Sequence, residues 1–300
     1  MEKDIGTFVH KPLLSILMPV YNPEPVFFRQ ALESVLAQTY PYWELCIADD
    51  ASTNGAVKEI LEKYRQRDCR LKVVYREVNG HISRASNSAL AMVTGEYVAL
   101  MDHDDLLTPD ALYCVAKEIN AADNELDLLY SDEIRIDDEN RLSEAFFKPD
   151  WNYQWLLTSN YVNHLSVYRT ENIRRINGFR AGYEGSQDYD LLLRFLRTTT
   201  EGRICHIPRV LYLWRVFSGS HTFSDDNKNV SVQAAARALT DYFSPRKIKI
   251  TPAVKNTGYF KVDVGLPAVP PLVSILISAG GETNVHGQCC PKLIILPLNC

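Results

Sequence analysis

Long apolar runs are missing from this sequence. No stretch approaches the roughly 20 consecutive apolar residues that a membrane-spanning helix needs, and the first residues, MEKDIGTFVHKP, lack the apolar segment of a secretory signal. Basic residues are not in excess either, since 32 Lys and Arg stand against 37 Asp and Glu, for a net charge of −5. Because nucleic-acid binding needs clustered basic side chains, we expect no nucleic-acid partner. These absences predict a cytoplasmic protein.

Paired cysteines of the CxxC type are also missing. Four cysteines are scattered and three lie near the C-terminus: Cys46, Cys69, Cys114, Cys205, Cys289, Cys290 and Cys300. In a cytoplasmic protein this pattern is typical of reduced thiols rather than of a disulfide framework or a zinc site. The chain is instead rich in apolar residues, with 46% hydrophobic and 23% charged among 300 positions. Such a composition indicates a folded protein with one large domain or two smaller ones.

Apolar runs and helical patterns alternate along the first part of the chain. Strands are predicted over 13–20, 43–50, 71–77 and 96–102, and helices over 26–38, 55–67, 83–93 and from Pro109 to about Asn120. This alternation indicates right-handed crossovers and a mostly parallel sheet with helices on both faces. Ligands bind such sheets at the carboxyl ends of the strands. Carboxylates gather at these ends: Asp49, Asp50, Asp102, Asp104 and Asp105.

The remainder of the chain is predicted to be less regular. Strands are expected over 126–137, 164–169 and 210–217, and helices over 186–197 and 230–243. After the Pro-rich segment GLPAVPP (265–271), PLVSILIS at 271–278 repeats PLLSILMP at 12–19 with five identical positions of eight. We interpret this tail as the truncated start of a second repeat, with chance similarity between two apolar strands as the alternative.

These patterns predict the following division of the chain. Residues 1–11 are an N-terminal extension, and residues 12–262 form one domain with halves at 12–125 and 126–262. Residues 263–300 contain the linker and the partial repeat.

The stretch YVALMDHDDLLTPD (97–110) concentrates three carboxylates within four residues. Asp102, Asp104 and Asp105 follow a buried strand, where they repel one another unless a cation neutralises them. Mg²⁺ and Mn²⁺ prefer oxygen ligands, and Mg²⁺ usually binds one or two carboxylates together with substrate phosphates. The D-x-D pair Asp102 and Asp104 can therefore offer one carboxylate to a metal and another to a sugar or ribose hydroxyl. A solvated acidic loop that caps the helix at Pro109 is the alternative.

Two further carboxylates are candidates for a ligand site. Asp50 ends the second predicted strand, where it can accept hydrogen bonds from a base or a ribose; capping the next helix is the alternative. Asp188 opens an apolar helix after Glu184-Gly185-Ser186. A helix N-terminus stabilises its anionic form, which suits a carboxylate that accepts a proton. Ordinary helix capping is the simpler alternative for Asp188.

Four stretches, in this order and spacing, resemble the family 2 glycosyltransferases with the GT-A fold. They are PLLSILMPVYNP, ELCIADDAST, NGHISRASNSALAMVTGEYVALMDHDDLLTPDAL and EGSQDYDLLLR, and the similarity covers about residues 12 to 245. YSDEIRID, FKPDW, NYVNHLSVYR and HIPRVLYLWR further resemble a bacterial subgroup. Members of this subgroup build surface polysaccharides such as O-antigens, often containing rhamnose, and often join two such domains. The resemblance implies an α/β fold with a mostly parallel nucleotide-binding sheet, flanking helices and a mixed acceptor half.

The resemblance also implies roles for individual residues. The implied nucleotide-sugar contacts are Pro19, Tyr21, Asp50, Arg84, Asp102 and His103. Asp104 corresponds to the ligand of Mn²⁺ or Mg²⁺, and Asp188 corresponds to the catalytic base. Residues implied on the acceptor side are His164, Glu184 and Trp155.

The chain departs from the family pattern near the motif YLWRVF. Leu213 and Phe217 stand where many relatives carry a histidine in or just after this motif. His221 is close enough in sequence to substitute as a metal ligand; a surface histidine is the alternative. Trp151, Trp155 and Tyr183 are candidates for stacking on sugar faces, or else aromatic residues of the core.

The expected activity is inverting transfer of a sugar from a UDP, dTDP or GDP sugar to a hydroxyl of a growing glycan. A lipid-linked acceptor would bring the chain to the inner face of the membrane. A catalytically weak sugar-nucleotide-binding remnant is a second interpretation, because a family histidine is missing and the repeat is partial. A phosphatase of the haloacid-dehalogenase type is a third, but it explains neither Leu106 after the D-x-D motif nor Asp188.

Overall fold

The computed structural model describes residues 1–216, 225–244, 246, 248–253, 258–263, 265, 269 and 272. Two compact units divide the chain, Met1–Val264 and Gly265–Cys300, and the helices and strands of the described residues lie in the first. The predicted repeat at 271–278 and most of the linker lie outside the described residues. None of the helices in the described part of the chain combines the length and the hydropathy of a transmembrane segment.

Parallel strands form the first half of the central sheet, in the order β3-β2-β1-β4. These strands are β1 (Leu14–Val20), β2 (Trp43–Asp49), β3 (Leu71–Tyr75) and β4 (Tyr97–Leu100). The connecting helices are α2 (Pro25–Leu36), α3 (Gly55–Arg67) and α4 (His81–Leu90). The predicted alternation of strand and helix is confirmed, with boundaries shifted by a few residues.

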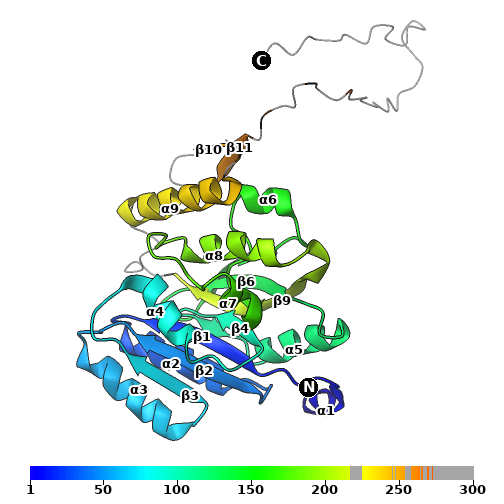
Figure 1. Ribbon diagram of the computed structural model, residues 1–300. Helices are drawn as coiled ribbons and strands as arrows, with labels where there is room; N and C mark the ends of the chain where they lie inside the picture. Colours follow the sequence, from blue (N-terminus) through cyan, green and yellow to red (C-terminus); the bar gives the residue numbers. More distant parts are fainter. Residues whose placement is uncertain are drawn as a thin grey trace, which may run out of the picture. The chain divides into compact units, whose positions relative to one another are not determined.

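Strand β1 is apolar along its length because both of its faces are covered. Successive side chains of a strand point to opposite faces. Ile16 and Met18 pack in a core cluster with residues of α2, α3 and α5 (Ala111–Ala121), whereas Leu17 packs with residues of α4 and α8 (Gln187–Phe195). Figure 1 shows these two helix layers on opposite sides of the sheet. A continuous apolar run is typical of such a doubly covered strand.

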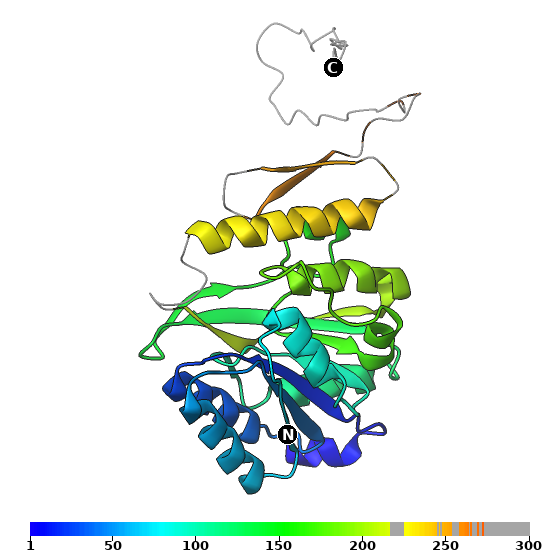
Figure 2. The same cartoon turned by 60° about the vertical axis from the view of Figure 1, so that its left-hand side comes forward.

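The second half of the sheet is mixed, as the sequence predicted. Its strands are β5 (Leu106–Leu107), β6 (Leu128–Ile136), β7 (Leu142–Phe146), β8 (Ser166–Arg169) and β9 (Ile204–Arg215). The order continues as β4-β8-β6-β9-β5, with β7 paired to β6. β8 is antiparallel to both of its neighbours, and β6 is parallel to β9. In Figure 2 the β6–β7 hairpin, coloured green, extends beyond the neighbouring strands.

Further elements complete the unit. They are α1 (Glu2–Thr7), α6 (Tyr153–Thr158), α7 (Thr170–Arg175), α9 (Asp225–Phe243), β10 (Lys249–Pro252), β11 (Phe260–Asp263) and two turns of 3₁₀ helix, η1 (Leu196–Thr198) and η2 (Glu201–Arg203). Helix α9 packs through Ala235, Ala238 and Leu239 into the same core cluster as α8 (Figure 2).

Three predicted boundaries are wrong. The helix expected from Pro109 begins at Ala111, because Thr108 to Asp110 form a turn in which the Thr108 hydroxyl donates to Asp110 at 2.8 Å. β9 begins at Ile204 instead of 210, since it pairs with β6 along its length. α9 begins at Asp225 instead of 230.

Candidate active site

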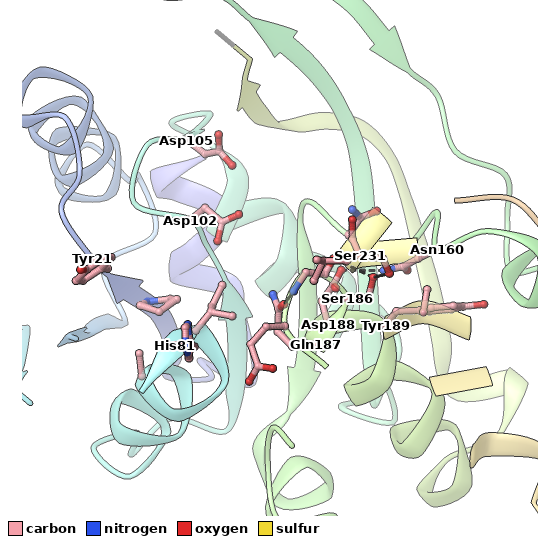
Figure 3. A pocket seen from close by; sticks show the side chains of 18 of the residues that line it. Tyr21, His81, Asp102, Asp105, Asn160, Ser186, Gln187, Asp188, Tyr189 and Ser231 are labelled. Atoms are coloured by element: carbon pink, nitrogen blue, oxygen red, sulfur yellow. Dashed lines mark hydrogen bonds between the residues drawn. The ribbon is translucent and has the colours of Figure 1, made fainter. Parts of the chain in front are cut away.

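A cavity of about 990 Å³ opens where β1, β2 and β4 end. Eight residues predicted from the sequence line it: Pro19, Tyr21, Asp50, Asp102, His103, Asp104, Glu184 and Asp188. Figure 3 shows Tyr21 and His81 on one side and Asp188 and Asn160 on the other. The structure therefore brings the ends of three strands and the start of α8 to one place, although these segments are far apart in the sequence.

Three predicted residues do not belong to this lining. Arg84 is exposed on α4, and its backbone carbonyl accepts a hydrogen bond from Arg76 at 3.3 Å. Trp155 is 39% exposed on α6, with its ring against Tyr161. His164 lies beside Asp102, with Nε2 3.9 Å from a carboxylate oxygen. A further predicted residue, His221, lies outside the described residues, as does Phe217.

Asp50 is buried and organises the loop before α4. Both of its carboxylate oxygens accept from the backbone N–H of Gly80 at 3.0 Å, and one accepts from Arg76 Nε at 2.6 Å. Asp50 is not the cap of the next helix, because Asn54 accepts from the N–H of Ala56 at the start of α3. The Asp50 carboxylate is thus held at the cavity edge by the Arg76 guanidinium and the backbone N–H of Gly80.

The acidic loop after β4 is anchored to β9. Asp105 is 1% exposed, and its oxygens accept from the Tyr212 hydroxyl and from the backbone N–H of Arg215, both at 2.6 Å. The Arg215 guanidinium donates to the Asp104 carbonyl at 2.8 Å, and β5 pairs with Tyr212 and Leu213. The loop is therefore anchored at Asp105 as a wall of the cavity, and Asp105 is not a solvated surface residue.

The carboxylates of this loop lose hydration and repel one another. Burial raises the pKa of Asp102. The positive charge of His164 acts to lower this pKa, and the negative charge of Asp104 acts to raise it further. The Asp102 side chain keeps 47% of its surface exposed. Burial raises the pKa of Asp105 well above the usual value, and the charges of Asp104 and Asp102 raise it further. Ligand atoms of Asp102, Asp105 and His164 lie within 4.8 Å of one another. A bound cation would relieve this repulsion.

His164 connects the acidic loop to a buried ion pair. Its Nδ1 lies 3.5 Å from an oxygen of Glu133, and its ring stacks on Tyr212 with centroids 5.1 Å apart. Burial acts to lower the pKa of His164, but the contact with Glu133 and the negative charges of Glu133, Asp105 and Asp102 outweigh it and raise the pKa to about 9. The imidazole is thus surrounded by carboxylates on two sides.

Asp188 faces the cavity from the first turn of α8. The N-cap of this helix is Ser186, so Asp188 is not the cap itself. Its Oδ2 accepts from Asn160 Nδ2 at 2.8 Å. Burial raises the pKa of Asp188, while the charge of His164 and hydrogen bonds from backbone N–H groups and Asn160 oppose the shift. The geometry lets this carboxylate meet a ligand that occupies the cavity.

Residues 15–176, just over half of the chain, match the family model described as Glycosyl transferase family 2. The chain belongs to glycosyltransferase family 2. An uncharacterized protein of Sinorhizobium fredii, y4gI, is 43% identical over 91% of this chain and 30% of its own length. The O-antigen biosynthesis protein RfbC of Myxococcus xanthus is 34% identical over 81% of this chain and 19% of its own length. This family 2 chain therefore spans about a fifth to a third of the length of these relatives.

A solved structure shares the fold of this family 2 chain. The mannosyltransferase PcManGT from Pyrobaculum calidifontis, in complex with GDP-Man and Mn²⁺, superposes with a TM-score of 0.58 at 21% identity, over 79% of this chain and 68% of that one. Together with the family match, this likeness confirms the predicted GT-A fold.

The aromatic lining of this family 2 chain differs from the prediction. Trp151 packs against the core, and Tyr183 packs there too, with its hydroxyl on Asp241. The aromatic residues that do line the cavity are Tyr21, Tyr189, Trp214 and Phe260. Sequence pattern alone does not separate core aromatic residues from lining ones.

Four residues around the site were not found from the sequence: Arg76, Glu133, Lys148 and Arg215. Arg76 directly follows β3, so the rule that picked the carboxylates at strand ends could have found it. Glu133 lies in the predicted strand 126–137, among acidic residues within that strand. This is a weaker signal than a charged residue directly after a strand. Lys148 and Arg215 stand in the quoted stretches FKPDW and HIPRVLYLWR, but these stretches do not reveal their partners, which come from other segments.

Proposed function

We propose that this chain is the donor-binding and catalytic part of a glycosyltransferase. It moves a sugar, with inversion, from a nucleotide-diphosphate sugar to a hydroxyl of a growing surface glycan. The observation that carries the proposal is that Asp50, Asp104 and Asp188, from three separate segments, line one cavity. Its volume of about 990 Å³ has room for a nucleotide sugar and part of an acceptor.

The donor side is the part of the cavity near β1 and β2. Pro19 and Tyr21 form its edge, and Asp50 meets the base. Although the Asp50 oxygens accept from Gly80 and Arg76, a carboxylate has about four lone-pair sites and can accept one more hydrogen bond. Asp102 and His103 face the ribose, whereas Arg84, exposed on α4, reaches the nucleotide only from outside.

The acidic loop fits Mn²⁺ or Mg²⁺. Asp104 lines the cavity beside the group of Asp102, Asp105 and His164, and carboxylate oxygens with one imidazole nitrogen suit a hard or borderline divalent cation. Asp104 is the ligand we assign first. When bound, the cation supplies Lewis-acid stabilisation of the diphosphate leaving group. PcManGT, which shares the fold, was solved in complex with Mn²⁺.

Asp188 acts as the base that takes the proton of the acceptor hydroxyl. General base catalysis is typically worth about 10²–10⁴-fold, and alignment of the acceptor supplies much of the rest. Glu184 lines the acceptor side, and Trp155 lies farther out on the surface. The acceptor is a glycan or a lipid-linked glycan, consistent with the O-antigen function named for RfbC. A lipid-linked acceptor implies peripheral association with the membrane.

The donor is identified by a thermal-shift screen of UDP, dTDP and GDP sugars with Mn²⁺ or Mg²⁺. A ligand at 100 times its Kd raises the free energy of unfolding by about 2.7 kcal/mol. Transfer and donor hydrolysis are then measured for Asp104→Ala and Asp188→Asn, with the exposed Glu59→Gln on α3 as a matched control. We expect Asp188→Asn to lower turnover by about 10²–10⁴-fold while nucleotide binding persists in calorimetry.

Undiminished turnover in both site variants would reject the residue assignment. Tight nucleotide binding by the natural sequence without transfer to any glycan acceptor would favour the binding remnant instead.

A further inference from the structure

A buried ion pair, Lys148–Glu133, lies behind the cavity and takes no part in the donor binding or proton transfer proposed for this site. The Lys148 side chain is 0% exposed, and its ammonium donates to the backbone carbonyls of Asn163 and His164. The same nitrogen lies 3.2 Å from Oε2 of Glu133, whose side chain is 9% exposed. Glu133 contacts Nδ1 of His164, and Nε2 of His164 lies beside the carboxylate of Asp102.

Such a buried ion pair is weak evidence for stability, because apolar residues of similar volume often stabilise a fold as well or better. In this protein the Lys148–Glu133 pair contacts both the backbone and the ring of His164. Lys148 fixes the two backbone carbonyls at the position of His164, where the backbone has a positive φ of 53°. It also holds the Glu133 carboxylate against the imidazole. The ring itself stacks on Tyr212 and contacts Trp214, both on β9, and these contacts restrict its orientation.

Two buried atoms in this arrangement make no hydrogen bond among the described residues and face each other, although the first also belongs to the ion pair with Lys148. They are Oε2 of Glu133 and Nδ1 of His164, 3.5 Å apart. A proton on Nδ1, directed at Glu133, satisfies both atoms with a small movement of the ring. A cation that binds there displaces any proton on Nε2, and in the resulting tautomer Nε2 offers its lone pair on the side of Asp102, 3.9 Å away.

We propose that Glu133 is a positioning residue that turns Nε2 of His164 toward Asp102 and Asp105, as the nitrogen donor of the cation site. Histidines that bind metals usually donate their other ring N–H to a carboxylate or a carbonyl, and that partner fixes tautomer and orientation. The three ligand atoms already lie within 4.8 Å of one another. This inference rests on the proposed function, because it concerns the cation that the transfer reaction uses.

A nitrogen donor has a consequence for the choice of metal. Imidazole favours transition-metal ions over Mg²⁺, which prefers oxygen ligands alone. The arrangement therefore predicts that Mn²⁺ binds more tightly than Mg²⁺, and that this preference depends on Glu133.

The chain offers a matched control one residue away. Asp132, also on β6, is a buried carboxylate that contacts an imidazole, with Oδ1 2.8 Å from Nε2 of His206. The Asp132 carboxylate also accepts from the backbone N–H of Lys148 at 2.9 Å, so this control tests whether loss of a neighbouring buried charge is enough to disturb the site. Asp132→Asn and Glu133→Gln thus remove the same charge from the same strand, and only the second contacts His164.

The test uses the full chain with Mn²⁺ as the probe, in the presence of UDP, GDP or dTDP in turn. Unbound Mn²⁺ is counted by electron paramagnetic resonance, and the ¹⁴N modulation of bound Mn²⁺ is recorded by electron spin echo. We expect an imidazole signal in the natural sequence that changes on ¹⁵N-histidine labelling and disappears in His164→Gln. We expect Glu133→Gln to weaken Mn²⁺ binding about 10–100-fold, and Asp132→Asn to leave it unchanged.

Three outcomes overturn the inference. Bound Mn²⁺ without an imidazole signal removes His164 from the site, and this result needs no variant to fold. Equal losses in Glu133→Gln and Asp132→Asn assign Glu133 a general structural role. Failure of the natural sequence to bind Mn²⁺ with any of the three nucleotides contradicts the metal assignment of the proposed function as well, so the two failures are distinguishable.

Discussion

Asp105 and Asp188 are carboxylates of the same cavity, yet their surroundings suit them to different tasks. Asp105 has both oxygens engaged by Tyr212 and Arg215 and is almost completely buried. Asp188 accepts one side-chain hydrogen bond, from Asn160, and remains partly exposed toward the cavity. Asp105 therefore holds the acidic loop in place, whereas Asp188 has a free lone pair with which to receive a proton.

Burial, His164 and the hydrogen bond from Asn160 together determine the pH range in which Asp188 is ionised. Burial raises the pKa of Asp188 above 3.8, and the hydrogen bond from Asn160 lowers it because it favours the anion. Under the proposed function Asp188 must be an anion to accept the proton, so we expect turnover to fall as the pH falls through this pKa. We expect Asn160→Ala to move the acid limb of the kcat/KM profile to higher pH and to lower the maximum rate. Ser159→Ala, another residue of the lining, is the control; identical limbs in both variants would refute this role.

Local signals explain which site residues were predictable. Asp50 directly follows β2, and Asp102 and Asp104 lie in the loop after β4, so the rule that ligands meet strand ends places them at one cavity. Neither Glu133 nor Lys148 could be predicted as partners of His164. Their meeting depends on how β6, the segment after β7 and the segment before β8 come together, which no local pattern records.

At the scale of elements, the parallel half of the fold was predictable and parts of the mixed half were not. α3 occupies the predicted residues 55–67, because helical spacing and turn signals are local. β5 has two residues and exists through its pairing with β9. β7 is exposed along its whole length, so it lacks the apolar alternation that marks a strand.

Glu44 on β2 ties several elements together and gives a prediction at this scale. Its buried carboxylate accepts from Ser15 on β1 at 2.7 Å, from Lys72 on β3 at 2.6 Å and from the N–H of Thr94 at 2.6 Å. Burial acts to raise the pKa of Glu44, but these donors outweigh it and lower the pKa from 4.5 to about 2. A difference of this size corresponds to about 3 kcal/mol.

Because the folded-state pKa of Glu44 is depressed, its contribution is complete above pH 4.5 and is lost as the pH falls toward 2. We expect Glu44→Gln to lower the free energy of unfolding by about 3 kcal/mol at neutral pH. The difference from the natural sequence should shrink below pH 4.5. Urea unfolding across this pH range measures it, with Glu59→Gln as an exposed control. A loss that does not vary with pH would show that the Glu44 charge is not what stabilises the fold.

At the scale of the molecule, the cavity is formed where the two halves of the sheet meet. The parallel half supplies Asp50 and the acidic loop, and the mixed half supplies β9, which anchors that loop. Asp188 comes from α8, which packs on the face opposite α2 and α3. The cavity therefore depends on the correct packing of both halves, and neither half contains all three carboxylates of the proposed site.

A crystal structure with Mn²⁺ and the nucleoside diphosphate chosen by the thermal-shift screen would decide whether these three carboxylates share one ligand. We expect an anomalous Mn²⁺ peak beside Asp104 and the Asp102–Asp105–His164 group, the base against Asp50, and open space for a sugar between the diphosphate and Asp188. A nucleotide bound outside this cavity, or one whose diphosphate lies away from both Asp104 and Asp188, would refute the proposed site.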